Sequence, residues 1–398
     1  MREPIIVLGA TGSIGKQCLD ILKYSFDYAL IGVSLNSHYE VLEPYLGYFD
    51  QLKYVAITDQ KKANEFHLLH PDFIVLSGDD ANLEILRRNK NANVFNSLIG
   101  NVGLRPALLA LRQNQDLLLS NKESLVIGSS LIKKELEHSS SHLYPVDSEH
   151  VGLAKTLNEL KKEKIPTKDI DELIVTASGG ALRDLPKDEI DSVTPERVLH
   201  HPTWLMGPKI TVDSATLVNK GYEVIEASVL FDFPVDQVKA VICRESLVHA
   251  LVKYQKNKKT SYLYEYSPCD MKVSIAYALS KGTLGIHQNT PEDKKQVEKL
   301  HFEKIDPDFY PLFPLTIKTF KVFGNVGMIY YNAVDTLAVN SFLKGEIPYS
   351  FIRESLLFAF ETMPTLPPLT EEGLPEIERQ AEKFAEQTLI KVSLLLRR

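Results

Sequence analysis

The strongest constraint on the fold lies at the start of the chain, where an apolar run leads directly into a glycine-rich turn and then into a helical pattern. Residues 4–8 are typical of a buried strand, residues 9–15 read GATGSIG, and residues 16–22 have the spacing of a helix. A strand, a tight turn and a helix in this order open a βαβ unit. The chain is therefore expected to begin with a parallel sheet.

The same alternation of short apolar runs and helix-length segments continues to about residue 150. The runs are IIVLG, ALIGVS, YVAIT, FIVLS, DLLLS and HLYPVD. Strands that alternate with helices in this way form mostly parallel sheets with helices on their faces. The pattern predicts an α/β fold with an N-terminal Rossmann-like parallel-sheet domain over residues 1–150.

The pattern changes twice in the rest of the chain. Between residues 151 and 285, the strand-like runs ELIVTA, VKAVICRES and TSYLYEYS mix with helical and loop segments, which predicts a central α+β catalytic domain. A polar linker is expected over residues 286–310. Helical spacing after it predicts a C-terminal helical domain over residues 311–398. A length of 398 residues fits two or three domains.

Composition narrows the partners and the compartment. The net charge is −7 with acidic and basic residues interspersed, so a nucleic-acid partner is not expected. No apolar stretch has membrane-spanning length and no signal or transit peptide precedes the first strand, so we expect a cytoplasmic protein without a membrane partner. Cys18, Cys243 and Cys269 are far apart and odd in number, which indicates neither a disulfide scaffold nor a thiolate zinc site.

The glycine turn has the features of a dinucleotide site. Its glycines would let the backbone approach a pyrophosphate, while Thr11, Ser13 and the helix N-terminus would supply hydrogen-bond donors. The spacing is GxxGxxG rather than GxGxxG, so a glycine-rich turn that binds nothing stays an alternative. No carboxylate follows the second strand, where Leu35, Asn36, Ser37 and His38 stand; this favours NADP over NAD, although no Arg or Lys stands there either.

Three acidic residues are candidates for a metal site. Asp147 and Glu149 follow the run HLYPV, and side chains two apart in extended backbone point to one face; Glu223 follows Lys220 by one helical turn. Three carboxylates without a thiolate suit a hard cation such as Mg²⁺ or Mn²⁺. Alternatively, Asp147 and Glu149 merely cap the next helix. Glu226 is interpreted as a solvated or salt-bridged helix residue.

Further polar residues have the types that a phosphate site needs. They are Ser178 after the run ELIVTA, Ser214, Asn219 and Lys220, although each alone is more often a turn or cap residue. Residues 200–207, HHPTWLMG, place the only tryptophan, Trp204, in a loop-like stretch. This stretch is either a lid over a substrate or a loop anchored to the core by its tryptophan.

Taken together and in order, these segments resemble the 1-deoxy-D-xylulose 5-phosphate reductoisomerase family essentially from end to end. The matching motifs are GATGSIG, NKES at residues 121–124, PVDSEH, TASGG, HPTWLMG, KITVDSAT and NKGYEVIEA. The resemblance implies a homodimeric enzyme of the non-mevalonate isoprenoid pathway that uses NADPH and Mg²⁺ or Mn²⁺, with Co²⁺ possible. It would rearrange and reduce 1-deoxy-D-xylulose 5-phosphate to 2-C-methyl-D-erythritol 4-phosphate.

The resemblance also implies roles for individual residues. The catalytic group would be Lys122, Asp147, Glu149, Glu223 and His201, and the metal ligands among them Asp147, Glu149 and Glu223. The cofactor would contact Gly9, Thr11, Gly12, Ser13, Ile14, Gly15, Asn36, Asn121, Lys122, Glu123 and Gly207. The substrate would contact Ser148, Glu149, Ser178, His201, Trp204, Met206, Ser214, Asn219, Lys220 and Glu223, with His201, Trp204 and Met206 forming a closing flap.

The chain departs from the family pattern at four places. Asn36-Ser37-His38 replaces a Gly-Lys-Asn stretch, and the flap has Thr203, Leu205 and Pro208 where HPNWSMG and a basic residue are usual. CRES at residues 243–246 replaces HPQS, and NAVD at 332–335 replaces part of NAANE. Two rival functions stay open, namely another NADP-dependent sugar-phosphate or semialdehyde dehydrogenase and a nucleotide-sensing binding protein.

Overall fold

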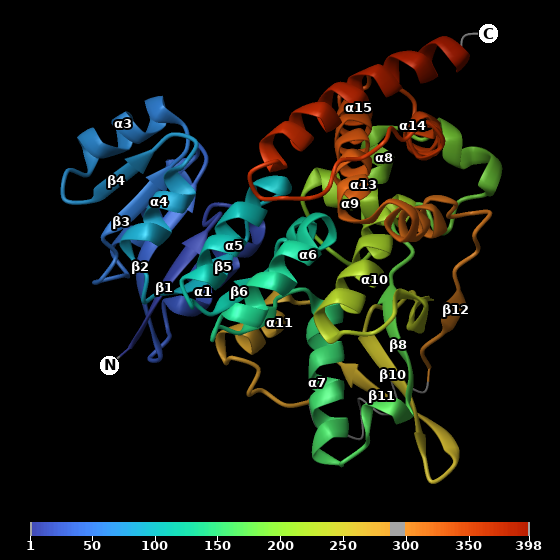
Figure 1. The fold of residues 1–398 in the computed structure, drawn as a ribbon, viewed down its shortest axis with the longest axis horizontal. Coiled ribbons are helices and arrows are strands. Elements are labelled where there is room, and N and C mark those ends of the chain that lie inside the picture. The colour runs from blue at the N-terminus through green and yellow to red at the C-terminus, as the bar shows by residue number, and fades with distance from the viewer. Residues whose placement is uncertain (1, 287–298, 397–398) are drawn as a thin grey trace. The chain divides into compact units, whose positions relative to one another are not determined.

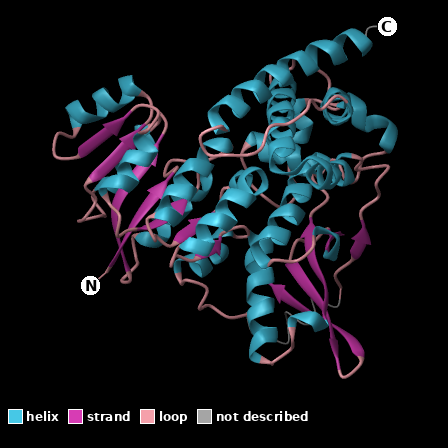
Figure 2. Cartoon of the chain, in the orientation of Figure 1, coloured by secondary structure: helices cyan, strands magenta, loops and turns pink. Residues whose placement is uncertain are grey.

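The structure is a computed structural model that describes residues 2–286 and 299–396 (Figures 1 and 2). The chain forms two compact units. The first comprises residues 1–151 and 270–284, and the second comprises residues 152–269 and 285–398. Residues 287–298 of the predicted linker lie outside the described residues.

The first unit is built on a seven-stranded parallel sheet with the order β4-β3-β2-β1-β5-β6-β7. Its strands are β1 (Glu3–Leu8), β2 (Tyr28–Leu35), β3 (Tyr54–Ile57), β4 (Ile74–Ser77), β5 (Asn93–Asn96), β6 (Leu117–Leu119) and β7 (Leu143–Pro145). The helices are α1 (Ser13–Leu22), α2 (Glu43–Leu46), α3 (Gln60–Leu69), α4 (Ala81–Arg88), α5 (Leu104–Arg112), α6 (Lys122–His138) and α11 (Met271–Leu279), with 3-10 turns at Tyr39–Val41 and Asn101–Gly103. The predicted Rossmann-like sheet is confirmed.

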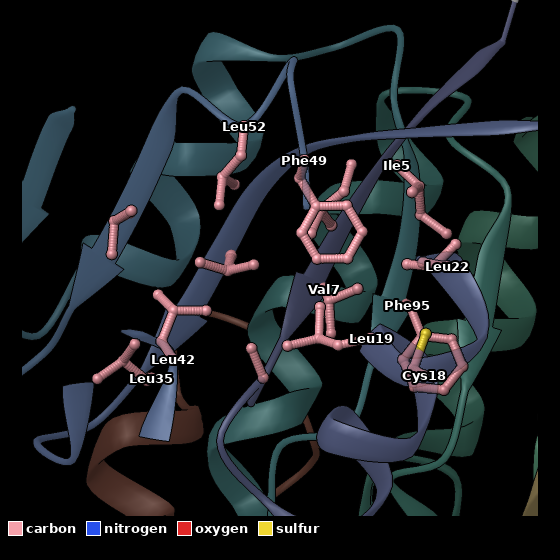
Figure 3. Packing of buried hydrophobic residues seen from close by; sticks show 14 of the residues in the cluster. Ile5, Val7, Cys18, Leu19, Leu22, Leu35, Leu42, Phe49, Leu52 and Phe95 are labelled. Carbon is pink, nitrogen blue, oxygen red and sulfur yellow. The ribbon is translucent and has the colours of Figure 1, made fainter. Parts of the chain in front are cut away.

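Alternation along β1 explains why this sheet is covered on both faces. Ile5 and Val7 belong to the core cluster that includes Leu19 of α1 (Figure 3). Ile6 points to the opposite face of the sheet. This is seen at neighbouring Gly32, where an added Cβ would meet side-chain atoms of both Ile6 and Ile85 of α4. Both sets are fully buried, as expected for a parallel sheet covered by helices.

Residues 270–284 pack with the first unit although they lie far along the chain. Ile275 and Leu279 of α11 join the same core cluster as Leu19. The Tyr28 hydroxyl donates to the Leu279 carbonyl at 2.7 Å, and the Lys281 ammonium pairs with the Glu3 carboxylate at 2.7 Å. The compact units therefore assign residues 270–284 to the first unit, whereas the predicted domain ranges are 1–150, 151–285, 286–310 and 311–398. These four ranges stay predictions.

The second unit combines a mixed sheet with helices. The five-stranded sheet has the order β11-β10-β8-β9-β12, in which only β8 and β9 are parallel neighbours. The strands are β8 (Ile170–Ala177), β9 (Val238–Cys243), β10 (Val248–Lys256), β11 (Lys259–Tyr266) and β12 (Phe302–Lys304). The helices are α7 (Ser148–Lys162), which begins in the first unit's range, α8 (Pro195–Val198), α9 (Pro208–Thr216), α10 (Val218–Phe231), α13 (Leu312–Leu343), α14 (Ser350–Glu361) and α15 (Leu374–Leu396), with 3-10 turns at Thr167–Asp169, Lys187–Ser192 and Val235–Gln237.

The core of the second unit joins α7, α10 and β8. Leu153 and Leu160 of α7 pack with Val224 and Ala227 of α10 and with Val175 of β8. The predicted C-terminal helices are confirmed as α13, α14 and α15, although two predicted segments fall within α13, whose backbone is non-helical only at Gly324. None of the described helices is long and apolar enough to cross a membrane.

We expect Gly15→Ala to destabilise the first unit and to weaken dinucleotide binding. A Cβ at Gly15 would lie 2.7 Å from the Cα of Ala10, so the backbone of the turn would have to shift. A shift of this kind in a packed region costs about 1–3 kcal/mol. Thermal unfolding is the measurement and Gly47→Ala the control, because no atom lies within 4 Å of a Cβ at Gly47. Equal losses in both variants would contradict this reading.

Candidate functional site

The glycine turn lies where the order of the parallel sheet reverses. The chain proceeds from β1 outward to β4 and then returns to the other side of β1 at β5. Ligands of doubly wound sheets bind at such a switch point, outside the carboxyl ends of the strands. Gly9 follows β1 with a φ of 76°, and a Cβ there would lie 2.6 Å from the carbonyl oxygen of Ser97, which follows β5. Only glycine fits this close approach of two strand ends.

The remaining residues of the turn lead into α1. Gly12 is the residue before the helix, which begins at Ser13. Thr11 is half-buried, Ser13 is exposed, and the Ile14 side chain packs against the core of the first unit. The helix N-terminus and the exposed hydroxyl are thus available to an anion, whereas Ile14 can offer only its backbone.

Two asparagines mark the ends of other strands of the same sheet. Asn121 caps α6 by accepting from the Ser124 N–H at 3.1 Å, and its amide donates to the Leu98 carbonyl and to the Glu123 carboxylate. Asn36 follows β2, is exposed, and accepts a 2.6 Å hydrogen bond from the Thr58 hydroxyl. Asn121 is therefore a buried structural cap, while Asn36 remains accessible at the carboxyl edge of the sheet.

Lys122 and Asp147 meet because β6 and β7 are parallel neighbours. Each residue follows its strand closely, so both lie at the same edge of the sheet. The Lys122 ammonium is 2.7 Å from an Asp147 carboxylate oxygen, and the two side chains are only 12% and 13% exposed. The sheet therefore builds a nearly buried ion pair at its carboxyl edge.

The prediction that Asp147 and Glu149 share one face of extended backbone is wrong. Strand β7 ends at Pro145 and α7 begins at Ser148, so Glu149 lies in the first helical turn. Asp147 accepts from the Glu149 N–H at 3.3 Å and so caps α7, and the Ser148 hydroxyl donates to the Glu149 carboxylate at 2.5 Å. Capping uses one oxygen of Asp147, while the other faces Lys122.

Asp147 is ionised in its buried position. Burial alone would raise the pKa of its carboxyl, but the charge of Lys122 and the ring of His150 outweigh burial and hold the pKa well below its usual range. His150 is fully buried, with its Nδ1 3.4 Å from an Asp147 oxygen. An ionised carboxylate of this kind is ready to act as a ligand for a cation.

Glu223 is the third acidic candidate and lies on α10. Its side chain is 2% exposed; it accepts from the Asn219 amide at 2.6 Å and pairs with the Lys220 ammonium. Asp147, Glu149 and Glu223 form a group that could hold a metal ion, because one ligand oxygen of each lies within 4.8 Å of the others. Glu226 is 1% exposed, so its interpretation as a solvated residue is wrong.

The phosphate candidates separate into two groups. Asn219 and Lys220 contact Glu223, whereas Ser178 and Ser214 face His201. The Ser178 hydroxyl is 2.9 Å and the Ser214 hydroxyl 3.4 Å from Nε2 of His201. The two serines and the histidine come from the β8 end, from α9 and from the loop before α9, so the fold of the second unit gathers them at one point.

His201 is neutral, and its proton is placed by the loop itself. Burial, aided by the positive charge of Arg183, lowers the pKa of the imidazole to about 4. Its Nδ1 accepts from the backbone N–H groups of Thr203 and Trp204 at 3.2 and 2.9 Å. The proton of the neutral ring therefore resides on Nε2, which donates toward the two serine hydroxyls.

The predicted flap is a loop that ends at α9. Trp204 is half-buried with its ring 5.9 Å from that of His249, Met206 is half-buried, and Leu205 is 98% exposed. Gly207 is exposed and precedes the first turn of α9. The lid and core-anchor interpretations of Trp204 both remain compatible with this partial burial.

Three residues near the site escaped the sequence analysis. Arg183 donates to the Ser178 carbonyl at 2.6 Å, and the Tyr310 hydroxyl donates to the Gly179 carbonyl at 2.9 Å. Lys209 pairs with a fully buried aspartate of α13 at 2.6 Å. Lys209 lies in the motif KITVDSAT and Arg183 lies three residues after TASGG, so their charges could have been noted as candidates for the site. Nothing in the sequence around Tyr310 indicates its role.

The fold and the site define a dinucleotide-binding α/β protein with an acidic group suited to a metal, the class of the metal-dependent oxidoreductases. Three family models match the chain. These are 1-deoxy-D-xylulose 5-phosphate reductoisomerase over residues 5–129, its C-terminal domain over residues 143–231, and a further DXP reductoisomerase C-terminal domain over residues 266–384. The chain belongs to the 1-deoxy-D-xylulose 5-phosphate reductoisomerase family, and the resemblance seen in the sequence is confirmed.

Curated relatives and solved structures agree with this assignment. The reductoisomerase of Bacillus pumilus is 33% identical over 97% of this chain and 99% of its own, and that of Bacillus subtilis 36% identical over 88% and 90%. The Zymomonas mobilis reductoisomerase in complex with NADPH is 28% identical with a TM-score of 0.83, over 98% of this chain and 99% of its own. A reductoisomerase in complex with NADPH, fosmidomycin and magnesium is 28% identical with a TM-score of 0.87, over 99% of both chains.

We expect the His201 ring to stay neutral from about pH 8 down to about pH 5.5, because the pKa is lowered to about 4. Ring NMR signals, assigned by their loss in His201→Gln, are the measurement. The lowered pKa also predicts that the stability contributed by the neutral ring is present above about pH 6.5 and declines as the pH falls toward 4. A titration step of the His201 signal near pH 6.5 would show that the ring is not shielded.

Proposed function

We propose that the chain catalyses the NADPH- and divalent-metal-dependent rearrangement and reduction of 1-deoxy-D-xylulose 5-phosphate to 2-C-methyl-D-erythritol 4-phosphate, in the non-mevalonate isoprenoid pathway. The single observation that carries the proposal is the group of three carboxylates, Asp147, Glu149 and Glu223, with Lys122 paired to the first of them. The names of full-length relatives and the NADPH, fosmidomycin and magnesium in solved structures of the family support it.

The donor set fits a hard cation. Three carboxylates offer oxygen ligands only, so Mg²⁺ or Mn²⁺, with Co²⁺ also possible, would be held by Asp147, Glu149 and Glu223. The bound cation would supply Lewis-acid polarisation of the substrate's ketone and a neighbouring hydroxyl. The protein's own contribution is to keep Asp147 ionised, which its lowered pKa supports, and to fix Glu149 in the first turn of α7.

The lysines beside the carboxylates would balance charge. Lys122 pairs with Asp147 and Lys220 with Glu223, so each buried carboxylate retains a cationic partner. When a cation enters, these ammonium groups become available to oxygens of the substrate. Lys122 follows β6 at the carboxyl edge of the dinucleotide-binding sheet, so we assign it the role of orienting both the substrate and the nicotinamide.

The glycine turn fits a dinucleotide. The N-terminus of α1 suits a pyrophosphate, and NADPH would supply the hydride for the reduction step. We assign cofactor contacts to the turn residues, to Asn36 at the end of β2, to Lys122, and to Asn121 and Glu123 as the cap that shapes the same edge. Gly207 would contribute its backbone.

The substrate's phosphate would bind the polar groups of the second unit. Ser178 and Ser214 are each within hydrogen-bond reach of the neutral Nε2–H of His201, and the three groups would donate to oxygens of the phosphate. Asn219 and Lys220 would add an amide and a positive charge. Binding energy from this remote phosphate would position the reacting end, while Trp204 and Met206 close over it and Ser148 supports Glu149.

Two finer proposals follow from the family. We propose that the enzyme is a homodimer. Size-exclusion chromatography with light scattering would test this, and a monomeric mass would contradict it. We also propose a cytoplasmic location, supported by the absence of a disulfide among the described residues. The rival dehydrogenase without rearrangement and the nucleotide sensor both lose support, because neither needs the acidic group.

We expect Asp147→Asn to lower turnover by more than about 100-fold while leaving NADPH binding within about 2-fold, since the change removes a ligand charge but not the glycine turn. Turnover is measured with 1-deoxy-D-xylulose 5-phosphate, NADPH and Mg²⁺ or Mn²⁺, and the product is identified by mass and NMR. Asp116→Asn is the matched control, because Asp116 also pairs with a lysine, at 3.0 Å, away from the proposed site. Full turnover of Asp147→Asn, or full turnover in chelator, would favour the rival dehydrogenase.

We expect kcat/KM to be higher with NADPH than with NADH. The exposed Asn36 at the end of β2 offers no carboxylate to a ribose 2′-hydroxyl and no negative charge that would repel a 2′-phosphate. Asn36→Asp should therefore lower kcat/KM for NADPH by about 10-fold relative to NADH. An NADH preference of the unmodified enzyme would contradict the assignment of the cofactor.

A further inference from the structure

The loop that carries Ser178 has its peptide groups fixed in one orientation. The loop consists of Ser178, Gly179 and Gly180 and follows β8. Both glycines have positive φ values, 86° and 73°, and a Cβ on Gly180 would lie 2.6 Å from the Cα of Ala215 in α9. The loop is therefore held close to the helix that supplies Ser214.

Two side chains bind the carbonyl oxygens of this loop. Arg183 donates to the Ser178 carbonyl at 2.6 Å and to the Arg244 carbonyl at 2.9 Å. The Tyr310 hydroxyl donates to the Gly179 carbonyl at 2.9 Å. In a trans peptide the N–H points opposite to the C=O. With both carbonyls drawn toward Arg183 and Tyr310, the N–H groups of Gly179 and Gly180 point away from those two side chains.

The N–H groups of Gly179 and Gly180 differ in their hydrogen bonding. The Gly180 N–H donates to the Ser178 hydroxyl at 3.1 Å, and that hydroxyl faces Nε2 of His201 at 2.9 Å. Within the described part of the chain, the Gly179 N–H has no hydrogen-bond acceptor. The loop thus presents donors on one side while its acceptors are occupied on the other, which is the polarity that an anion requires.

Tyr310 is rigidly placed for this role. It is 4% exposed and packs in a small core cluster with Ala177, the last residue of β8, and Leu217, the residue between α9 and α10. Burial raises the pKa of its hydroxyl to about 12, so the hydroxyl keeps its proton and remains a donor. One side chain therefore contacts both the Ser178 loop and the α9–α10 junction that precedes Asn219 and Lys220.

We propose that Tyr310, together with Arg183, is a positioning residue for the substrate's phosphate: it fixes the Ser178–Gly180 peptides so that the Gly179 N–H and the Ser178 hydroxyl face the anion. The inference rests on the proposed function, in which this loop binds phosphate. Tyr310 does not touch the substrate and acts only through the loop. Its removal should therefore weaken phosphate binding without impairing the chemical step.

The test is Tyr310→Phe in the full-length enzyme, which deletes one oxygen. We expect KM for 1-deoxy-D-xylulose 5-phosphate and the inhibition constant of inorganic phosphate both to rise about 5-fold, the factor of one neutral hydrogen bond, with kcat within 2-fold. Tyr330→Phe is the matched control, because that buried tyrosine also makes one hydrogen bond, at 3.2 Å to Gln380. Tyr330→Phe should leave both constants unchanged.

A second variant keeps the test independent of the folding of the first. Arg183→Lys retains the positive charge, but the shorter lysine side chain does not bring its ammonium to the position of Nη1, which donates to both carbonyl groups, so the same rise in KM and in the phosphate inhibition constant is expected. Unchanged constants in both variants, while Ser178→Ala raises them, would overturn the inference and leave the proposed function standing. Unchanged constants in Ser178→Ala as well would instead remove the phosphate assignment itself. Equal rises in Tyr310→Phe and Tyr330→Phe would show a general loss of packing and overturn the inference.

Discussion

Charge pairing inside the protein is the constraint on which the site depends. Asp147 and Glu223 are almost removed from water, and an unpaired carboxylate in such a place would take up a proton instead of staying ionised. Lys122, from the neighbouring strand end, prevents this for Asp147 and holds its pKa below the usual range, while Lys220 pairs with Glu223 from one helical turn away. Asp147 is thus kept in the form that can bind a cation.

The two sheets place these charges by different means. In the first unit, the parallel strands place Gly9, Lys122 and Asp147 along one carboxyl edge of the sheet, although these residues lie far apart in the sequence. In the second unit, helix spacing within α10 sets Asn219, Lys220 and Glu223 on one face. Sheet topology therefore places the first group, and helical periodicity places the second.

The sequence predicts those features of the fold and the site that are determined by residues close together in the chain. The parallel sheet, the glycine turn and the Lys220–Glu223 spacing depend on nearby residues, and all three are present. Strand β5, with polar ends in NVFN, lacks an apolar run and was not predicted. The start of α7 at Ser148 stays open between two alternatives in the sequence, because a strand and a capped helix share the letters VDSE. Tyr310 acts across 131 positions on Gly179, a separation at which no sequence pattern signals contact.

The departures from the family pattern have a structural consequence beside the flap. Asp335, in the altered NAVD segment, is fully buried on α13 and lies 2.6 Å from the Lys209 ammonium, which is also 2.6 Å from Asp213. The charges of these two carboxylates raise the pKa of Lys209 far above its usual value and outweigh its burial. Lys209 directly follows Pro208, so the C-terminal end of the loop is anchored to α13 through charge. Its tip, where Leu205 is 98% exposed, has no such anchor among the described contacts. Any closure of this loop over a substrate must therefore take place in residues before α9, with α9 and Ser214 serving as the fixed side of the site.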